Sequence, residues 1–162
     1  MKNTLAAVPD SRARLRASGL SALLRRIVER LDAVPYSLLA IPLRLAVATV
    51  FWNSALVKLA DWPAALALFA DDYKLPLLPP VLAEHIAVSS ELSMPALLVL
   101  GLLTRPAALV LLGMTSVIEI FVYPQAWPTH IQWAAMLLVL LCRGAGTFSL
   151  DHWLRRVLAA PL

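Results

Sequence analysis

Seven ionisable residues that could take part in chemistry lie inside long apolar stretches of the sequence. They are Arg44, Lys58, Glu84, His85, Glu91, Glu119 and His130. A charged side chain in the centre of a bilayer costs about 2.5–3.5 kcal/mol on insertion scales, so each of these residues needs a partner or a ligand. Carboxylates and imidazoles transfer protons and bind metals, and a lysine ammonium donates hydrogen bonds. The set therefore offers proton transfer, metal binding or recognition of a polar headgroup.

The apolar stretches predict the helices that position these side chains. They run over about 38–60, 81–103, 106–123 and 129–143, and a helix needs ~20 residues to cross a bilayer core. Sixty per cent of the 162 residues are apolar and 15% are charged, a balance far from that of soluble proteins. We therefore predict an all-α polytopic membrane protein, with a four-transmembrane-helix bundle in residues 37–147.

The two flanking segments differ from the predicted bundle in charge and pattern. Residues 1–36 form a basic leader in which apolar residues recur at helical spacing opposite several arginines. This pattern favours an N-terminal amphipathic helix in the headgroup layer of a membrane, and a solvated helix that covers a partner protein is the alternative. Residues 148–162 predict a short cytoplasmic tail helix that begins at the N-cap residue Ser149.

The distribution of lysine and arginine predicts the orientation. Seven of these residues precede the first predicted span, whereas Lys74 is the single one between the first two spans and none lies between the last two. Because basic residues accumulate on the cytoplasmic side, both chain ends are predicted to be cytoplasmic. The net charge of +4 thus reflects topology, and no nucleic-acid partner is expected. The single cysteine, Cys142, excludes an internal disulfide framework.

The positions of the ionisable residues along the predicted spans sort them by depth. At 1.5 Å per residue, one group from four different helices falls at a similar depth near the outer boundary. We predict that this group surrounds one ligand site beneath the connector 61–80: Lys58, Glu84, His85, Glu119 and His130. The alternative is structural, with Lys58 bridging Glu84 and Glu119 while the histidines face lipid headgroups. Arg44 and Glu91 lie deeper and are predicted to form a structural buried charge pair.

Three groups of residues resemble the DoxX family of small four-helix bacterial inner-membrane proteins. They are Arg44, Phe51 and Lys58; Glu91 with the segment 101–105; and the segment 144–151. The resemblance covers about residues 43–151. The segments 69–80 and 121–128 are similar to a subgroup found alongside small secreted metal-binding peptide systems. The resemblance implies a multi-pass protein of the bacterial inner membrane that is associated with an oxidoreductase.

Two functional hypotheses follow from these observations. In the first, the outer layer binds a quinone headgroup and the protein is an accessory component of a membrane oxidoreductase system. Because the sequence has no flavin, nicotinamide or iron–sulfur motif, a redox partner protein would carry the electrons.

In the second hypothesis, the protein handles a metal or a metal-binding peptide without catalysis, and His85 and His130 are the candidate metal ligands. Haem would need these two histidines to face each other, so haem and metal rank below quinone. A scaffold without a ligand is the third option, and a homo-oligomer is compatible with all three.

Overall fold

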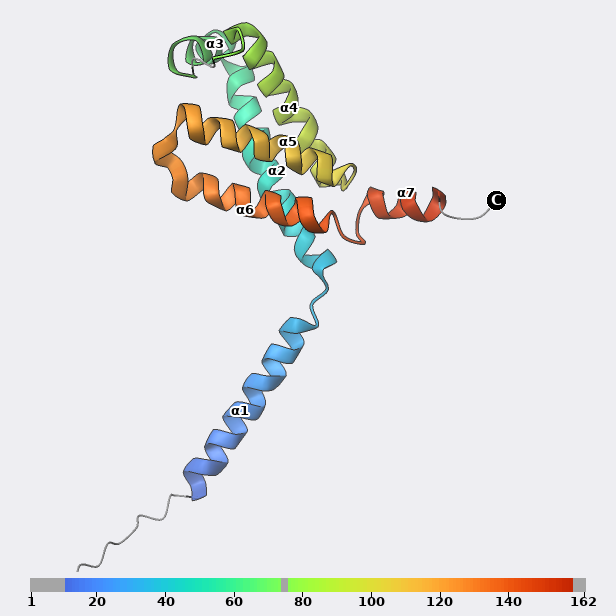
Figure 1. Cartoon of the computed structure of the whole chain (residues 1–162). Coiled ribbons are helices and arrows are strands. Elements are labelled where there is room, and N and C mark those ends of the chain that lie inside the picture. Colours follow the sequence, from blue (N-terminus) through green and yellow to red (C-terminus); the bar gives the residue numbers. More distant parts are fainter. Residues whose placement is uncertain (1–10, 74–75, 159–162) are drawn as a thin grey trace, which may run out of the picture. The chain divides into compact units, whose positions relative to one another are not determined.

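The computed structural model describes residues 11–73 and 76–158 of the chain, with side chains from residues 20–73 and 76–157 (Figure 1). The chain divides into two compact units, Met1–Pro35 and Tyr36–Leu162. In the first unit, helix α1 (Ser11–Asp32) occupies most of the predicted leader. Residues 1–10, Lys74 and residues 159–162, which contributed to the predicted leader, orientation and tail, lie outside the described residues.

The second unit is built from helices alone in its described residues. The long helices are α2 (Tyr36–Ala60), α4 (Pro80–Leu100), α5 (Thr104–Val117) and α6 (Trp127–Arg143). Short helices connect them: α3 (Trp62–Leu68), the π-helical turns η1 (Phe69–Tyr73) and η2 (Ile118–Val122), and the 3₁₀ turn η3 (Pro124–Ala126). Helix α7 (Leu150–Leu158) follows α6. The predicted all-α class is confirmed, and each predicted span coincides with a long helix.

The four long helices pack around one apolar core. Helix α2 contacts α4, α4 contacts α5, α5 contacts α6, and α6 returns to α2. The fully buried side chains at the centre are Val47, Phe51, Leu98, Leu111, Leu137 and Leu140. Ala107 and Ala108 on α5 are also fully buried, and such small residues let neighbouring helix backbones approach closely.

The helices differ in how well they fit a bilayer. Among the described residues, α2 and the continuous segment Thr104–Val122 are long and apolar enough to cross one. Helix α6 has 17 residues, fewer than the ~20 that a crossing needs, and α4 contains two glutamates that lower its hydropathy. All four nevertheless expose large apolar side chains, such as Leu56 on α2, Ile86 on α4, Leu109 on α5 and Leu138 on α6.

At one end of the unit, the segment after α6 is tied to the beginning of α2. The Tyr36 hydroxyl donates to the carbonyl of Gly144 (2.7 Å), and the backbone N–H of Thr147 donates to Ser37 Oγ (2.9 Å). Gly146 has a φ of +78°, and an added Cβ would lie 2.8 Å from Ser37 Cα, so this close approach requires glycine. These contacts join residues more than a hundred positions apart.

The beginning of α7 closes the same end by capping α5. One carboxylate oxygen of Asp151 accepts from the backbone N–H of Leu103 (2.8 Å), and the other accepts from that of Thr104 (3.1 Å). The N–H of Asp151 donates in turn to the carbonyl of Gly101 (2.9 Å). A carboxylate at a helix N-terminus binds N–H groups that have no partner within the helix. The α4–α5 turn, the end of α6 and the start of α7 therefore form one polar assembly.

Candidate ligand site at Lys58 and Glu91

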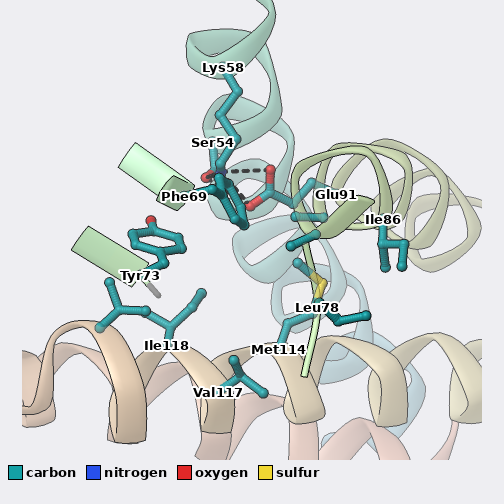
Figure 2. Close-up of a pocket in the computed structure, with 13 residues that line it drawn as sticks. Ser54, Lys58, Phe69, Tyr73, Leu78, Ile86, Glu91, Met114, Val117 and Ile118 are labelled. Atoms are coloured by element: carbon teal, nitrogen blue, oxygen red, sulfur yellow. Dashed lines mark hydrogen bonds and ion pairs between the residues drawn. The ribbon is translucent and has the colours of Figure 1, made fainter. Parts of the chain in front are cut away.

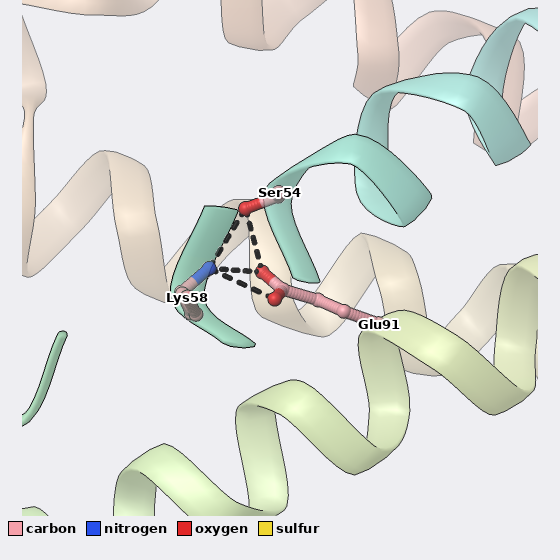
Figure 3. A network of polar contacts seen from close by, with 3 residues as sticks. All are labelled: Ser54, Lys58 and Glu91. Atoms are coloured by element: carbon pink, nitrogen blue, oxygen red, sulfur yellow. Dashed lines mark hydrogen bonds and ion pairs between the residues drawn. The ribbon is translucent and has the colours of Figure 1, made fainter. Parts of the chain in front are cut away.

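A buried charge pair links α2 to α4 at the other end of the unit. Lys58 Nζ donates to both carboxylate oxygens of Glu91, at 2.7 and 2.8 Å, and to Ser54 Oγ at 2.7 Å. Ser54 Oγ donates to Glu91 Oε1 at 3.0 Å, which closes the three-residue network in Figure 3. Ser54 lies one helical turn before Lys58, so both side chains leave the same face of α2.

The pair is almost removed from solvent, with side-chain exposures of 10% for Lys58 and 3% for Glu91. Burying two charges costs several kcal/mol per ion, and close pairing with additional hydrogen bonds offsets that cost. The hydroxyl of Ser54 supplies such an additional bond to each partner. The network is therefore well matched in charge, and removing either ionised partner would leave the other charge buried and unpaired.

A cavity of about 210 Å³ opens beside this network (Figure 2). Its polar lining includes Ser54, Lys58, Glu91 and Tyr73, and the remaining walls are mostly apolar. Those apolar walls come from the connector, α4, α5 and η2: Phe69, Leu78, Ala83, Ile86, Ala87, Met114, Val117, Ile118 and Val122. The cavity thus combines one charged corner with a largely apolar interior.

A second cavity of about 430 Å³ adjoins the first. Ser54, Lys58, Tyr73, Glu91 and Ile118 line both cavities, and the second extends to His130 and Trp133 on α6. The Trp133 ring contacts His130 with centroids 5.1 Å apart. The Lys58–Glu91 pair therefore lines both cavities. The first cavity extends toward α4 and α5, and the second extends toward α6.

The connector after α2 covers this end of the bundle, as its semi-apolar sequence predicts. Its Phe69 is buried, and the Tyr73 ring packs against Phe69 at 4.6 Å and against Tyr123 at 6.2 Å between centroids. Burial raises the pKa of Tyr73 to about 12, with smaller contributions from Tyr123, Glu91 and Asp72. Like an ordinary tyrosine, Tyr73 is protonated at neutral pH, so its phenol can donate a hydrogen bond.

The predicted outer layer does not form a single site. His130 Nδ1 pairs with Glu119 Oε2 at 2.5 Å, so these two residues bind each other. His85 is exposed, its Nδ1 lies 2.7 Å from the carbonyl of Val81, and its ring packs on Trp62. Glu84, adjacent to His85 on the helix, is fully buried while His85 is exposed, so their side chains lie in different surroundings. Lys58 bonds to neither Glu84 nor Glu119, so the alternative bridge between them is also absent from the described contacts.

Glu84 occupies an unusual position among the predicted residues. It is fully buried, and neither carboxylate oxygen has a hydrogen-bond partner within the part of the chain that the structure describes. A buried polar group without a partner is costly, so Glu84 lowers the stability of the fold at this position. None of the cavities described above includes Glu84 in its lining.

The metal and haem hypotheses gain no support from this geometry. No group of three or more histidine, cysteine, aspartate or glutamate side chains is placed to hold a metal ion in the described ranges. His85 packs on the connector while His130 points to Glu119, so the two histidines do not face a common axial position. The candidate site is therefore the polar corner at Lys58 and Glu91.

The predicted pair between Arg44 and Glu91 is replaced by other partners. Arg44 Nη1 donates to the carbonyls of Ala145 (3.2 Å) and Phe148 (3.0 Å), while Glu91 binds Lys58. An added Cβ on Gly101 would meet Arg44 Nη1, so Arg44 lies level with the end of α4. Ten residues separate Gly101 from Glu91, about 15 Å along a helix, which is too far for the predicted pair.

Sequence reasoning missed most of the cavity lining, including Ser54, Phe69 and Tyr73. A signal existed for Ser54, because the spacing of four from Lys58 places it on the same helix face. Phe69 and Tyr73 lie in the connector 61–80, which was predicted to cover the site and not to line it. Their place in the cavity depends on how the π-helical turn η1 folds over α4, which the apolar pattern does not specify.

Comparison with known proteins adds a family assignment. A family model described as DoxX matches residues 39–124, which include α2, α4, α5 and the Lys58–Glu91 pair. The chain belongs to the DoxX family. This DoxX protein is also similar to an uncharacterized protein of Haemophilus influenzae, with 32% identity over 127 residues that cover 71% of this chain and 82% of the relative. No solved structure matches this chain. The match is to the family as a whole and gives no support to the metal-binding-peptide subgroup.

Proposed function

We propose that this DoxX protein is a four-span membrane protein that binds a quinone headgroup beside Lys58 and Glu91 and serves as an accessory component of a membrane oxidoreductase system. The observation that supports this function is the cavity of about 210 Å³, which has a charged corner and largely apolar walls. A ligand that fits such a cavity has a polar end and an apolar body. Quinones have this character and dissolve in the bilayer that would surround the protein.

The residues present fit a quinone headgroup at the polar corner. The Tyr73 hydroxyl lines this cavity and would be available to donate to a carbonyl oxygen of the ring. Lys58 would supply a positive charge at the same corner of the cavity, and Glu91 holds its ammonium group in place. Phe69, Met114 and Ile118 would contact the apolar faces of the ring. A bound quinone would supply two-electron chemistry, and a redox partner protein would supply or accept the electrons.

Binding of a short-tailed ubiquinone analogue to the purified protein tests this proposal. In a detergent or nanodisc titration, we expect saturable quenching of tryptophan fluorescence and a rise in the thermal unfolding midpoint. Tyr73→Phe removes only the hydroxyl and should weaken binding by roughly threefold to tenfold, the effect of one neutral hydrogen bond.

Tyr123→Phe is the matched control for this experiment. Tyr123 contacts Tyr73 and lines the second cavity but not the first, so its hydroxyl should not affect binding. Absence of saturable binding would reject the quinone proposal. Equal affinity of Tyr73→Phe and the unmodified protein would reject the assigned hydrogen bond.

The four-span arrangement makes a separate prediction about topology. The end formed by the α4–α5 turn and α7 contains Arg105, Arg143, Arg155 and Arg156, and basic residues favour the cytoplasmic side. A reporter enzyme that is active only in the periplasm should work when fused after Tyr73 or Gln125 and fail when fused after Leu162. The opposite pattern of activity would reverse the proposed orientation.

A further inference from the structure

Three arginines converge on a pocket at the opposite end of the bundle from the Lys58–Glu91 site. The pocket has a volume of about 190 Å³ and lies between the start of α5, the end of α6 and the start of α7. Arg105, Arg143 and Arg155 line it together with Ser149, Asp151 and His152. It is bounded by the polar assembly that holds the segment 144–151 against the rest of the unit. We infer that this pocket binds a phosphate group.

The charges in the pocket favour a multiply charged anion. Three guanidinium groups face one carboxylate, and both oxygens of that carboxylate already accept backbone N–H groups. Guanidinium groups match the geometry of phosphate oxygens and can bind them through paired hydrogen bonds. The pocket is large enough for a phosphate group, because 190 Å³ corresponds to about six water molecules at ~30 Å³ each.

Two arginines of the pocket are oriented by neighbouring groups, and one buried nitrogen has no partner within the described part of the chain. Arg105 uses Nη2 to reach the carbonyl of Cys142 (3.2 Å), and Arg143 stacks over the Tyr36 ring at 4.8 Å, which orients both guanidinium groups. His152 Nε2 is buried and has no hydrogen-bond partner among the described residues. If this nitrogen is protonated, its N–H can donate a hydrogen bond to an anion in the pocket, which would give the buried nitrogen a partner.

The start of α7 is held in place beside the pocket. Ser149 Oγ accepts from the N–H of His152 (3.2 Å) and donates to the carbonyl of Gly146 (2.7 Å), which fixes the start of α7 beside the arginines. The N-terminus of a helix has a partial positive charge that adds to the attraction. The phosphate could belong to an anionic lipid headgroup at the membrane surface or to a free phosphate in solution.

Thermal unfolding of the full-length protein in zwitterionic detergent micelles distinguishes these two sources. One arm adds phosphatidylglycerol to the micelles, with phosphatidylcholine as its reference. The other adds inorganic phosphate, with chloride at equal ionic strength as its reference. A rise in the unfolding midpoint with phosphatidylglycerol alone identifies a lipid site, and a rise in both arms identifies a site for phosphate from either source. No rise in either arm overturns the inference.

A pair of neighbouring arginines provides a matched mutational test. Arg155 lines the pocket, whereas Arg156 is exposed on the same helix and does not. Arg155→Gln should raise the concentration of phosphate or phosphatidylglycerol needed for half-maximal stabilisation by roughly fivefold, as expected for one partly exposed charged contact. Arg156→Gln removes the same charge and should leave that concentration unchanged. Equal effects of the two variants would reduce the binding to nonspecific charge attraction and overturn the inference.

Discussion

Replacement of Glu91 by alanine is expected to destabilise the protein by roughly 3–5 kcal/mol, the usual effect of leaving a buried charge without its partner. Lys58 Nζ would keep only Ser54 Oγ as a hydrogen-bond acceptor among its present contacts. The free energy of unfolding can be measured by titrating a denaturing detergent against mixed micelles and following helical circular dichroism.

The double variant Lys58→Met with Glu91→Leu is the decisive comparison. Both charges are then absent and side chains of similar length fill the space, so most of the lost stability should return. Glu29→Gln on α1 provides a control for the loss of a carboxylate, because Glu29 is exposed and lies in the other compact unit. If the single and double losses were simply additive, the pair would not be coupled as the structure indicates.

Gly101→Ala is expected to destabilise the protein by roughly 2–4 kcal/mol, because two costs combine at this position. Gly101 ends α4 with a φ of +67°, a conformation that disfavours side chains. An added Cβ would also lie 2.5 Å from Arg44 Nη1 and 2.6 Å from Ser149 Cβ. The same unfolding titration measures this loss.

Gly113→Ala is the matched control for Gly101→Ala. Gly113 lies within helix α5, and no neighbouring atom comes within 4 Å of an added Cβ. The substitution should stabilise the protein by about 0.5–1 kcal/mol through helix propensity. Destabilisation of similar size at both positions would show that the close packing at Gly101 is not the cause.

Much of the helical fold could be predicted from the sequence because its boundaries have local chemical signals. Pro80 begins α4, Gly101 ends it, and Gly144 follows the end of α6. The predicted spans therefore differ from the observed helices by a few residues at each end. The interruption of α5 by the π-helical turn η2 was not predicted, since it depends on a hydrogen-bond pattern that apolar periodicity does not reveal.

The candidate site was harder to predict because it depends on the register between helices. Depth estimates from span boundaries place Arg44 within reach of Glu91, but the observed packing sets Lys58 level with Glu91 instead. Arg44 binds two backbone carbonyls, and carbonyls have no signature in the residue types. Glu119 and His130 were correctly placed on neighbouring helices, but they bind each other instead of Lys58, and of the two only His130 lines a cavity together with Lys58.

The long-range contacts of Arg44 have a consequence for how the protein is made. Arg44 lies on the first helix of its unit, and its two carbonyl partners follow 101 and 104 residues later. While the ribosome is still producing the chain, the nascent helix must therefore keep this guanidinium solvated or in contact with surrounding lipid. Asp151, which accepts the N–H groups at the first turn of α5, is likewise synthesised only after all four long helices. A chain interrupted before Ala145 has all four long helices but lacks the partners that Arg44 and the first turn of α5 have in the finished protein.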